Sequence, residues 1–188
     1  MGKNSEFEKL RNEILEILSE GKKAEEIEKF IFIHDNGEIG TFFDKSIVNI
    51  NVINSKDNTF IIDIYANLIF NVTIVEKLLG YLLTLNSKSL TGAFNLIINE
   101  KESNLGIVSF SYAFMIKNID REIFLKSFFT VGEIANYYAK EIQAKFGGLT
   151  INEYIKREDI PTSQKKIKDK NKGEQKREES SKIKELWE

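Results

Sequence analysis

The sequence predicts an α+β domain in which helices pack on one face or at the ends of an antiparallel sheet. Two observations predict the sheet. Apolar runs flank the turn-forming pair Asn36-Gly37, and residues 59–70 alternate so that one face is wholly apolar. A third observation predicts the main helix, because large apolar residues recur every three or four positions over 121–146. The expected order along the chain is α-ββββ-α-ββ-α.

The first predicted helix covers residues 5–20. Ser5 is its expected N-cap, and Glu8, three residues later, would complete a capping box. Gly21 is suited to end the helix, and a polar connection over 22–29 leads on to the sheet. The apolar residues of this helix recur at helical spacing: Phe7, Leu10, Ile14, Ile17 and Leu18.

Four strands are expected next. Asn36-Gly37 favours a type I′ turn, which needs positive φ at both positions, and this turn would join 29–34 to 38–43 as a hairpin. Residues 46–54 and 59–70 form the third and fourth strands. The fourth strand has a wholly apolar face, which we place in the core: Phe60, Ile62, Ile64, Ala66 and Leu68. Its other face is mixed: Ile61, Asp63, Tyr65 and Asn67.

A second helix is expected over 74–86, where Thr73 and Glu76 form another capping box. Its apolar residues span so wide an arc that we expect it to be covered on more than one side. Strands over 92–99 and 105–117 follow as a second hairpin. The residues of the first of these strands that we expect to point inward are Phe94, Leu96 and Ile98.

The long helix over 121–146 closes the domain. Asp120 is its expected N-cap, and Gly147-Gly148 would end it. A short helical turn is expected over 151–156. The apolar positions of the long helix are Phe124, Phe128, Val131, Ala135, Tyr138, Ile142 and Phe146.

We expect four segments along the chain. These are an N-terminal helix with its connection (1–28), the α+β domain (29–148), a short C-terminal extension (149–160) and a charged tail (161–188). Pro161 marks the start of the tail. The tail has too few apolar residues to offset the entropy of ordering it, so we expect it to be disordered, or a solvated helix at most.

The composition excludes several kinds of site. The 188-residue chain has no cysteine, which excludes disulfides, thiolate nucleophiles and cysteine-ligated zinc. Its single histidine, His34, is not accompanied by a G-x-S-x-G nucleophile motif, and we interpret it as a polar residue before a turn. A transition-metal site would have to combine His34 with carboxylates alone, which is a weak set of ligands. We therefore expect no metal and no cofactor, and the sequence contains no phosphate-binding glycine motif.

The formal net charge is −2, with an acidic excess in 1–160 and a basic excess in 161–188. An acidic body binds phosphate poorly, so we do not expect a nucleic-acid partner. The N-terminus lacks the apolar core of a signal peptide, and no apolar run reaches the roughly 18 residues of a membrane span. The sequence therefore predicts a cytoplasmic protein without a membrane span. An adaptor whose tail touches nucleic acid or membrane remains an alternative.

Asp63 is the most notable carboxylate, because acidic residues are uncommon inside an apolar strand. It could serve as the raised-pKa acid of a small-molecule-binding or hydrolytic enzyme. The simpler interpretation is a residue on the outer face of the sheet, since Asp63 alternates with Ile62 and Ile64. A deep pocket around Asp63 would favour the enzyme, and a solvent-facing Asp63 would oppose it.

The strand faces directed away from the helices form the candidate binding surface. On the stretch "SFSYAFMI" (109–116), one face is aromatic and would pack under the helices, while the other is small enough for a second backbone to approach. This outer side is either ordinary surface or a peptide or dimer surface. Its candidate residues are Ile61, Tyr65, Ile69, Ile97, Ser109, Ser111, Ala113 and Met115.

The succession of elements from 71 to 148 resembles the YbjN family and the wider type III secretion chaperone-like fold. The resemblance rests on the helix "TIVEKLLGYLLTLNSK", the strand "LTGAFNLII", the long strand "LGIVSFSYAFMIKN" and the capped long helix that follows. The hairpins over 29–70 are similar to the family's N-terminal strands. The likeness therefore covers about 29–148 and includes the pattern Leu82, Leu83, Leu85, Asn86.

The resemblance implies a small, dimeric bacterial protein, a peptide-binding chaperone or a regulator, that holds extended segments of its partners. No active-site motif defines the family, so the resemblance implies no catalytic residue. We therefore expect a non-enzymatic, chaperone-like protein or peptide-binding domain, possessing no cofactor and acting through a protein partner.

Overall fold

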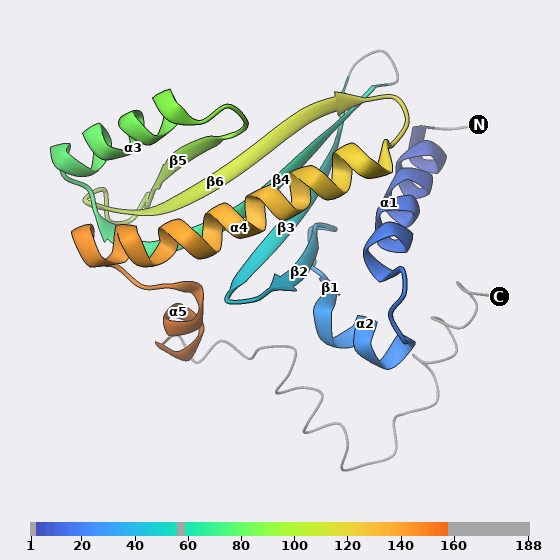
Figure 1. The fold of residues 1–188 in the computed structure, drawn as a ribbon, viewed down its shortest axis with the longest axis horizontal. Coiled ribbons are helices and arrows are strands. Elements are labelled where there is room, and N and C mark those ends of the chain that lie inside the picture. The colour runs from blue at the N-terminus through green and yellow to red at the C-terminus, as the bar shows by residue number, and fades with distance from the viewer. Residues whose placement is uncertain (1–2, 56–58, 158–188) are drawn as a thin grey trace, which may run out of the picture. The chain divides into compact units, whose positions relative to one another are not determined.

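The computed structural model describes residues 3–55 and 59–157, and the predicted tail 161–188 lies outside this part of the chain. The contacts within the chain define a unit that ends at Tyr154. Its centre is a six-stranded antiparallel sheet with the strand order β1-β2-β3-β4-β6-β5 (Figure 1). The α+β class and the antiparallel sheet predicted from the sequence are confirmed.

The elements follow one another as α1 (Lys3–Ser19), α2 (Ala24–Phe30), β1 (Ile31–Ile33), β2 (Ile39–Phe43), β3 (Ser46–Asn54), β4 (Phe60–Thr73), α3 (Glu76–Lys88), β5 (Ala93–Ile98), β6 (Leu105–Ile116), α4 (Arg121–Phe146) and α5 (Ile151–Arg157). The predicted order is therefore correct for the six strands and the three longer helices. The structure adds α2, and the predicted turn over 151–156 is the helix α5.

The N-terminal region differs from the prediction in two respects. Helix α1 begins at Lys3, so Ser5 lies inside the helix and is not its N-cap. Helix α2 forms where we expected a polar connection. Its first turn carries Glu25 and Glu26, and the Glu26 carboxylate accepts a hydrogen bond from the backbone N–H of Lys23. Acidic side chains at this end of a helix are favoured by the helix dipole.

The first hairpin forms, but its first strand is shorter than predicted, because Lys29 and Phe30 belong to α2. Its turn is also of another type. Among the turn residues only Gly37 has positive φ, at 87°. The Gly37 N–H donates to the carbonyl oxygen of His34 at 2.8 Å, and the His34 N–H donates to Glu38 at 2.9 Å. The connection is thus a longer loop that ends in a left-handed glycine, and not a two-residue type I′ turn.

The core lies on one face of the sheet. All five residues that we assigned to the core face of β4 are buried, from Phe60 to Leu68 in alternation. They form one apolar cluster with residues of the neighbouring strands and with α1, α3 and α4. None of the large apolar residues on the opposite sheet face belongs to this cluster. That opposite face is called the outer face below.

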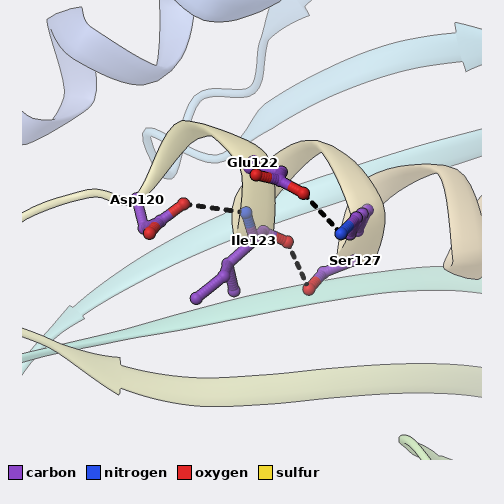
Figure 2. Close-up of polar contacts among 5 residues, drawn as sticks. Asp120, Glu122, Ile123 and Ser127 are labelled. Carbon is purple, nitrogen blue, oxygen red and sulfur yellow. Dashed lines mark hydrogen bonds and ion pairs between the residues drawn. The ribbon is translucent and has the colours of Figure 1, made fainter.

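Helix α4 runs along the core face, across the middle strands of the sheet (Figure 1). The predicted N-cap is confirmed, because the Asp120 carboxylate accepts a hydrogen bond from the Ile123 N–H at 3.0 Å (Figure 2). The predicted end is also confirmed, since Gly147 adopts a φ of 76° as C-cap. The buried residues of this helix are Phe124, Ser127, Phe128, Val131, Gly132, Ala135 and Ile142.

Helix α3 begins two residues later than predicted. Strand β4 continues to Thr73, so Thr73 is part of the sheet, and Val75 takes the N-cap position without a side-chain hydrogen bond. The predicted capping box is therefore wrong. Only Leu78 and Leu82 of this helix are buried. The expected cover on more than one side is not found within the described part of the chain.

Candidate functional site

The outer face brings most of the candidate surface residues together. Strand pairing places Ile61 opposite Met115 and Tyr65 opposite Ser111 on β4 and β6. Ala113 lies between these two β6 residues and is exposed. Ile97, on β5, is also exposed on this side, although it lies further along the sheet beside Ile107.

Two of the candidates are not available for contact. Ser109 faces outward between Asn67 and Asn95 but is only 3% exposed. Ile69 is completely buried, because the pairing of β4 with β6 shifts between Asn67 and Ile69 and places Ile69 beside Val108 in the core. An extra residue of this kind moves the following side chains to the other sheet face. The sequence prediction assumed unbroken alternation from Ile61 to Ile69 and therefore placed Ile69 on the wrong face.

Strand β5 contains one further difference. We expected Ile98 to point inward, but it is 57% exposed. Strand β5 is the last strand of the sheet, and Ile98 is its final residue. A residue at such a corner has core neighbours on one side only.

Asp63 lies partly buried on the outer face, near Tyr65 and Glu38. The Tyr65 hydroxyl donates a hydrogen bond to the Glu38 carboxylate at 3.0 Å. Burial, together with the negative charge of Glu38, raises the pKa of the Asp63 carboxyl above its usual range. The same two causes raise the pKa of Tyr65. His34 belongs to a separate contact, with its Nε2 3.1 Å from the side-chain oxygen of Asn49.

Two other kinds of feature, a metal site and a membrane-spanning helix, were considered in the described residues. No three His, Asp or Glu side chains within 3–55 and 59–157 are grouped so that they could hold a metal ion. Among the same residues, no helix has both the length and the apolar character needed to cross a membrane.

The clearest feature that sequence reasoning missed is an open strand edge on β6. The pairing of β5 with β6 stops where Ala93 meets Ser111, whereas β6 continues to Ile116 (Figure 1). Gly92, just before β5, is held so close to β6 that a Cβ on it would lie 2.5 Å from the Ser111 carbonyl oxygen. The residues before Gly92 do not pair with β6. Within the described chain, residues 112–116 therefore pair with β4 alone.

The direction of the backbone groups at this edge follows from one contact. The side chain of Asn86 binds both the N–H and the carbonyl oxygen of Phe94, on the side away from β6. Phe94 and Phe110 thus lie opposite each other without mutual hydrogen bonds. From Phe110 onward, the backbone groups of successive β6 residues point alternately towards β4 and towards the side of β5. The backbone N–H and C=O groups of Ala113 and Met115 consequently point to the open edge.

A groove lies beside the open edge, on the core side of the sheet. Ile123, on the first turn of α4, is 49% exposed and supplies apolar surface together with Tyr112 of β6. Ser127 has its hydroxyl bound to the Ile123 carbonyl oxygen, and Lys126 pairs with Glu122 (Figure 2). The lining residues are Thr91, Tyr112, Ile123, Lys126, Ser127 and Thr130.

Comparison with known proteins identifies similar chains but no family model that matches. An uncharacterized protein of Aquifex aeolicus (strain VF5) is 30% identical over 97 residues, which is 52% of this chain and 38% of that protein. The chain therefore spans about two fifths of the length of this curated relative.

Two solved structures are similar to the chain. YbjN from E. coli has a TM-score of 0.47 and 22% identity, over 64% of this chain and 85% of that one. The ExsC–ExsE complex has a TM-score of 0.48 and 12% identity, over 74% of this chain and 96% of that one. One of the two structures is thus a YbjN protein, and YbjN is the family that the sequence resembles. At these values the likeness concerns the fold alone.

Proposed function

We propose that this chain is a non-enzymatic, chaperone-like domain that holds an extended segment of a partner protein. The observation that supports it is the open edge of β6 over 112–116, next to a groove. An unpaired strand edge is a template for an added strand, and strand addition is a recurring mode of peptide recognition.

A segment added at this edge would use two kinds of contact. Its backbone would pair with the outward-directed N–H and C=O groups of Ala113 and Met115, independently of its sequence. Its side chains would alternate between the two sheet faces. Those on the core side would meet Tyr112 and Ile123, and those on the outer side would meet Met115, which is 67% exposed.

This arrangement gives the candidate residues different roles. Ala113 and Met115 border the added strand directly, and Ser111 lies opposite Ala93, the first residue of β5. Ile61 and Tyr65 are one strand further in, on the outer face. An apolar side chain that becomes fully buried contributes roughly 1.5–3 kcal/mol, so a few alternating apolar residues would select the partner segment.

The experiment compares three variants in a tagged capture from native cell lysate, read by mass spectrometry. Ala113→Pro removes the outward N–H, which an edge strand tolerates, and Ile123→Asp places a charge in the groove. Ile53→Asp is the matched control, because Ile53 is 42% exposed on β3. We expect wild type and Ile53→Asp to retain the same partner, and Ala113→Pro and Ile123→Asp to lose it. Equal capture by all four proteins would contradict the proposal.

The alternative of an enzyme that uses Asp63 has one observation in its favour, the raised pKa of its carboxyl. Asp63 lies on β4 directly opposite Ala113, one strand further in than the open edge of β6. Asp63→Asn leaves the backbone groups of that edge unchanged, so the two functions can be tested by separate substitutions. If capture of the partner is unchanged by Asp63→Asn but a small-molecule turnover is lost, the enzyme would replace the binding domain as the proposed function. The cytoplasmic location stays a prediction.

A further inference from the structure

Asp63 lies in one row with the open edge of β6. Strand pairing places Asp63 of β4 directly opposite Ala113, with both side chains on the outer face. The backbone groups of Ala113 point to the open edge, so a residue of an added strand that pairs with Ala113 would continue this row. Asp63, Ala113 and the added residue would then stand side by side across three strands.

The small side chain of Ala113 lets a long side chain cross the row. Ala113 is exposed and carries only a methyl group. Its Cα would lie about 5.5 Å from that of the added residue and about 4.5 Å from that of Asp63, so about 10 Å separate the two ends of the row. A lysine or arginine side chain reaches roughly 6–7 Å from its Cα, and an aspartate carboxylate about 3 Å, so the two groups can meet over the methyl group. Shorter side chains, such as valine or serine, end before Asp63.

The described chain does not supply a cation to this part of the outer face. Within 3–55 and 59–157, no Lys, Arg or His side chain forms an ion pair with Asp63 or with its neighbour Glu38. The Glu38 carboxylate accepts only the hydrogen bond from Tyr65, which lies on the same face of β4 as Asp63. Burial and the charge of Glu38 disfavour the ionised Asp63 carboxyl, as its raised pKa reflects, and a nearby cation would favour that ionised form again.

We propose that the partner segment carries a lysine or arginine opposite Ala113, and that Asp63 binds this cation from the neighbouring strand. This inference rests on the proposed strand addition, and it assigns Asp63 to the recognition of a partner and not to turnover. The residues before and after the basic one would point to the core side, where Tyr112 and Ile123 favour apolar side chains. The partner segment would therefore have the pattern apolar, basic, apolar.

The charge distribution of the chain favours a basic segment that comes from another protein. Residues 1–160 have an acidic excess, which attracts a cationic segment and repels an acidic one. The chain's own basic segment, 161–188, lacks the inferred pattern, because none of its lysines and arginines has an apolar residue on both sides. The occupant that we infer is therefore a partner protein and not this tail.

The test uses fluorescein-labelled peptides of the sequence Thr-Val-Thr-Val-Arg-Val-Thr-Val-Thr, and versions with glutamine or glutamate in place of the central arginine. Their binding to the full chain is measured by fluorescence anisotropy. We expect the arginine peptide to bind wild type about 10-fold more tightly than the glutamine peptide, and the glutamate peptide to bind most weakly. In Asp63→Asn the advantage of arginine over glutamine should fall below about 2-fold. Glu100→Gln is the matched control, because it removes a charge from the exposed turn before β6, and it should keep the full advantage.

The two chains and two peptides form a double-mutant cycle, in which a general effect of Asp63→Asn on the sheet cancels. Equal binding of the arginine and glutamine peptides to wild type would overturn the inference. If Ala113→Pro abolished that equal binding, strand addition itself would stand. An advantage of arginine that persists in Asp63→Asn would likewise overturn the role of Asp63. Failure of all three peptides to bind wild type would overturn strand addition at this edge, and this inference with it.

Discussion

Asn86 of α3 holds the backbone of Phe94 in β5 through two hydrogen bonds at once. Its amide nitrogen donates to the Phe94 carbonyl oxygen at 2.9 Å, and its side-chain oxygen accepts from the Phe94 N–H at 2.7 Å. The amide thus takes the place of a neighbouring strand at this point of the sheet edge. It also fixes the end of α3 against β5. The connection between the two elements turns at Gly92, which has positive φ.

Replacing this amide should therefore destabilise the fold. Asn86→Ala removes both hydrogen bonds and leaves the Phe94 backbone groups partly buried without partners. We expect a loss of about 2 kcal/mol, at roughly 1 kcal/mol for each bond, measured by urea unfolding. Asn95→Ala is the matched control, since Asn95 is exposed and its side-chain bonds lie at the surface. An equal loss in both variants would contradict the role of Asn86.

The N-cap of α4 provides a second prediction. Asp120→Ala removes the acceptor for the Ile123 N–H and should cost about 1 kcal/mol of unfolding free energy. Asp120→Ser should restore most of that loss, because serine is also a good N-cap. Chemical unfolding followed by circular dichroism measures both variants. If serine is no better than alanine, the cap does not act through this hydrogen bond.

Two helical glycines should respond in opposite ways to alanine. A Cβ at Gly132 in α4 would lie 2.4 Å from the ring of Phe43, whereas a Cβ at Gly80 in α3 has no atom within 4 Å. Gly132→Ala should destabilise by roughly 1–3 kcal/mol through overpacking. Gly80→Ala should stabilise by up to about 1 kcal/mol, because alanine favours the helix. Thermal unfolding of both variants checks the prediction, and shifts of the same sign would refute it.

The raised pKa of Asp63 predicts a pH-dependent effect. A carboxyl whose folded-state pKa is raised favours folding when protonated, and that contribution is lost as the pH rises from the usual value of 3.8 through the raised pKa. Asp63→Asn should therefore be more stable than wild type at pH 7 but not at pH 3.

Melting temperatures at both pH values test this prediction. Glu100→Gln removes one negative charge from an exposed turn and serves as the control. A gain at pH 7 that is the same for both variants would show that overall charge, and not the setting of Asp63, is responsible.

Several elements could be predicted from local sequence because local interactions form them. The apolar spacing of α4, its cap at Asp120 and its end at Gly147 depend on residues within a few positions of each other. The alternation of β4 over Phe60 to Leu68 likewise follows from its own side chains. The predicted start of α3 was wrong, because a helix-capping signal and a strand signal compete at Thr73. Thr73 is a suitable cap, but strand pairing extends β4 through it, since Thr73 pairs with Leu105.

The candidate site was predictable only in part. The sequence places Ala113 and Met115 on the outer side of their strand, and the structure has both exposed there. It could not reveal that β5 begins only opposite Ser111, because strand lengths are set by pairing between segments. Nor could it bring Ile123 of α4 beside Tyr112 of β6, since that contact depends on how the helix crosses the sheet.

The sequence by itself thus determined the fold class, the order of the strands and main helices, and most residues of the core, because hydrophobic periodicity acts over short distances. The tertiary structure alone decided which apolar residues remain uncovered. Leu78 and Leu83 have the same chemistry and lie on one helix, yet one is buried and the other is 70% exposed. The physical reason is that burial depends on what packs against each side of a helix, and the sheet covers only one side of α3.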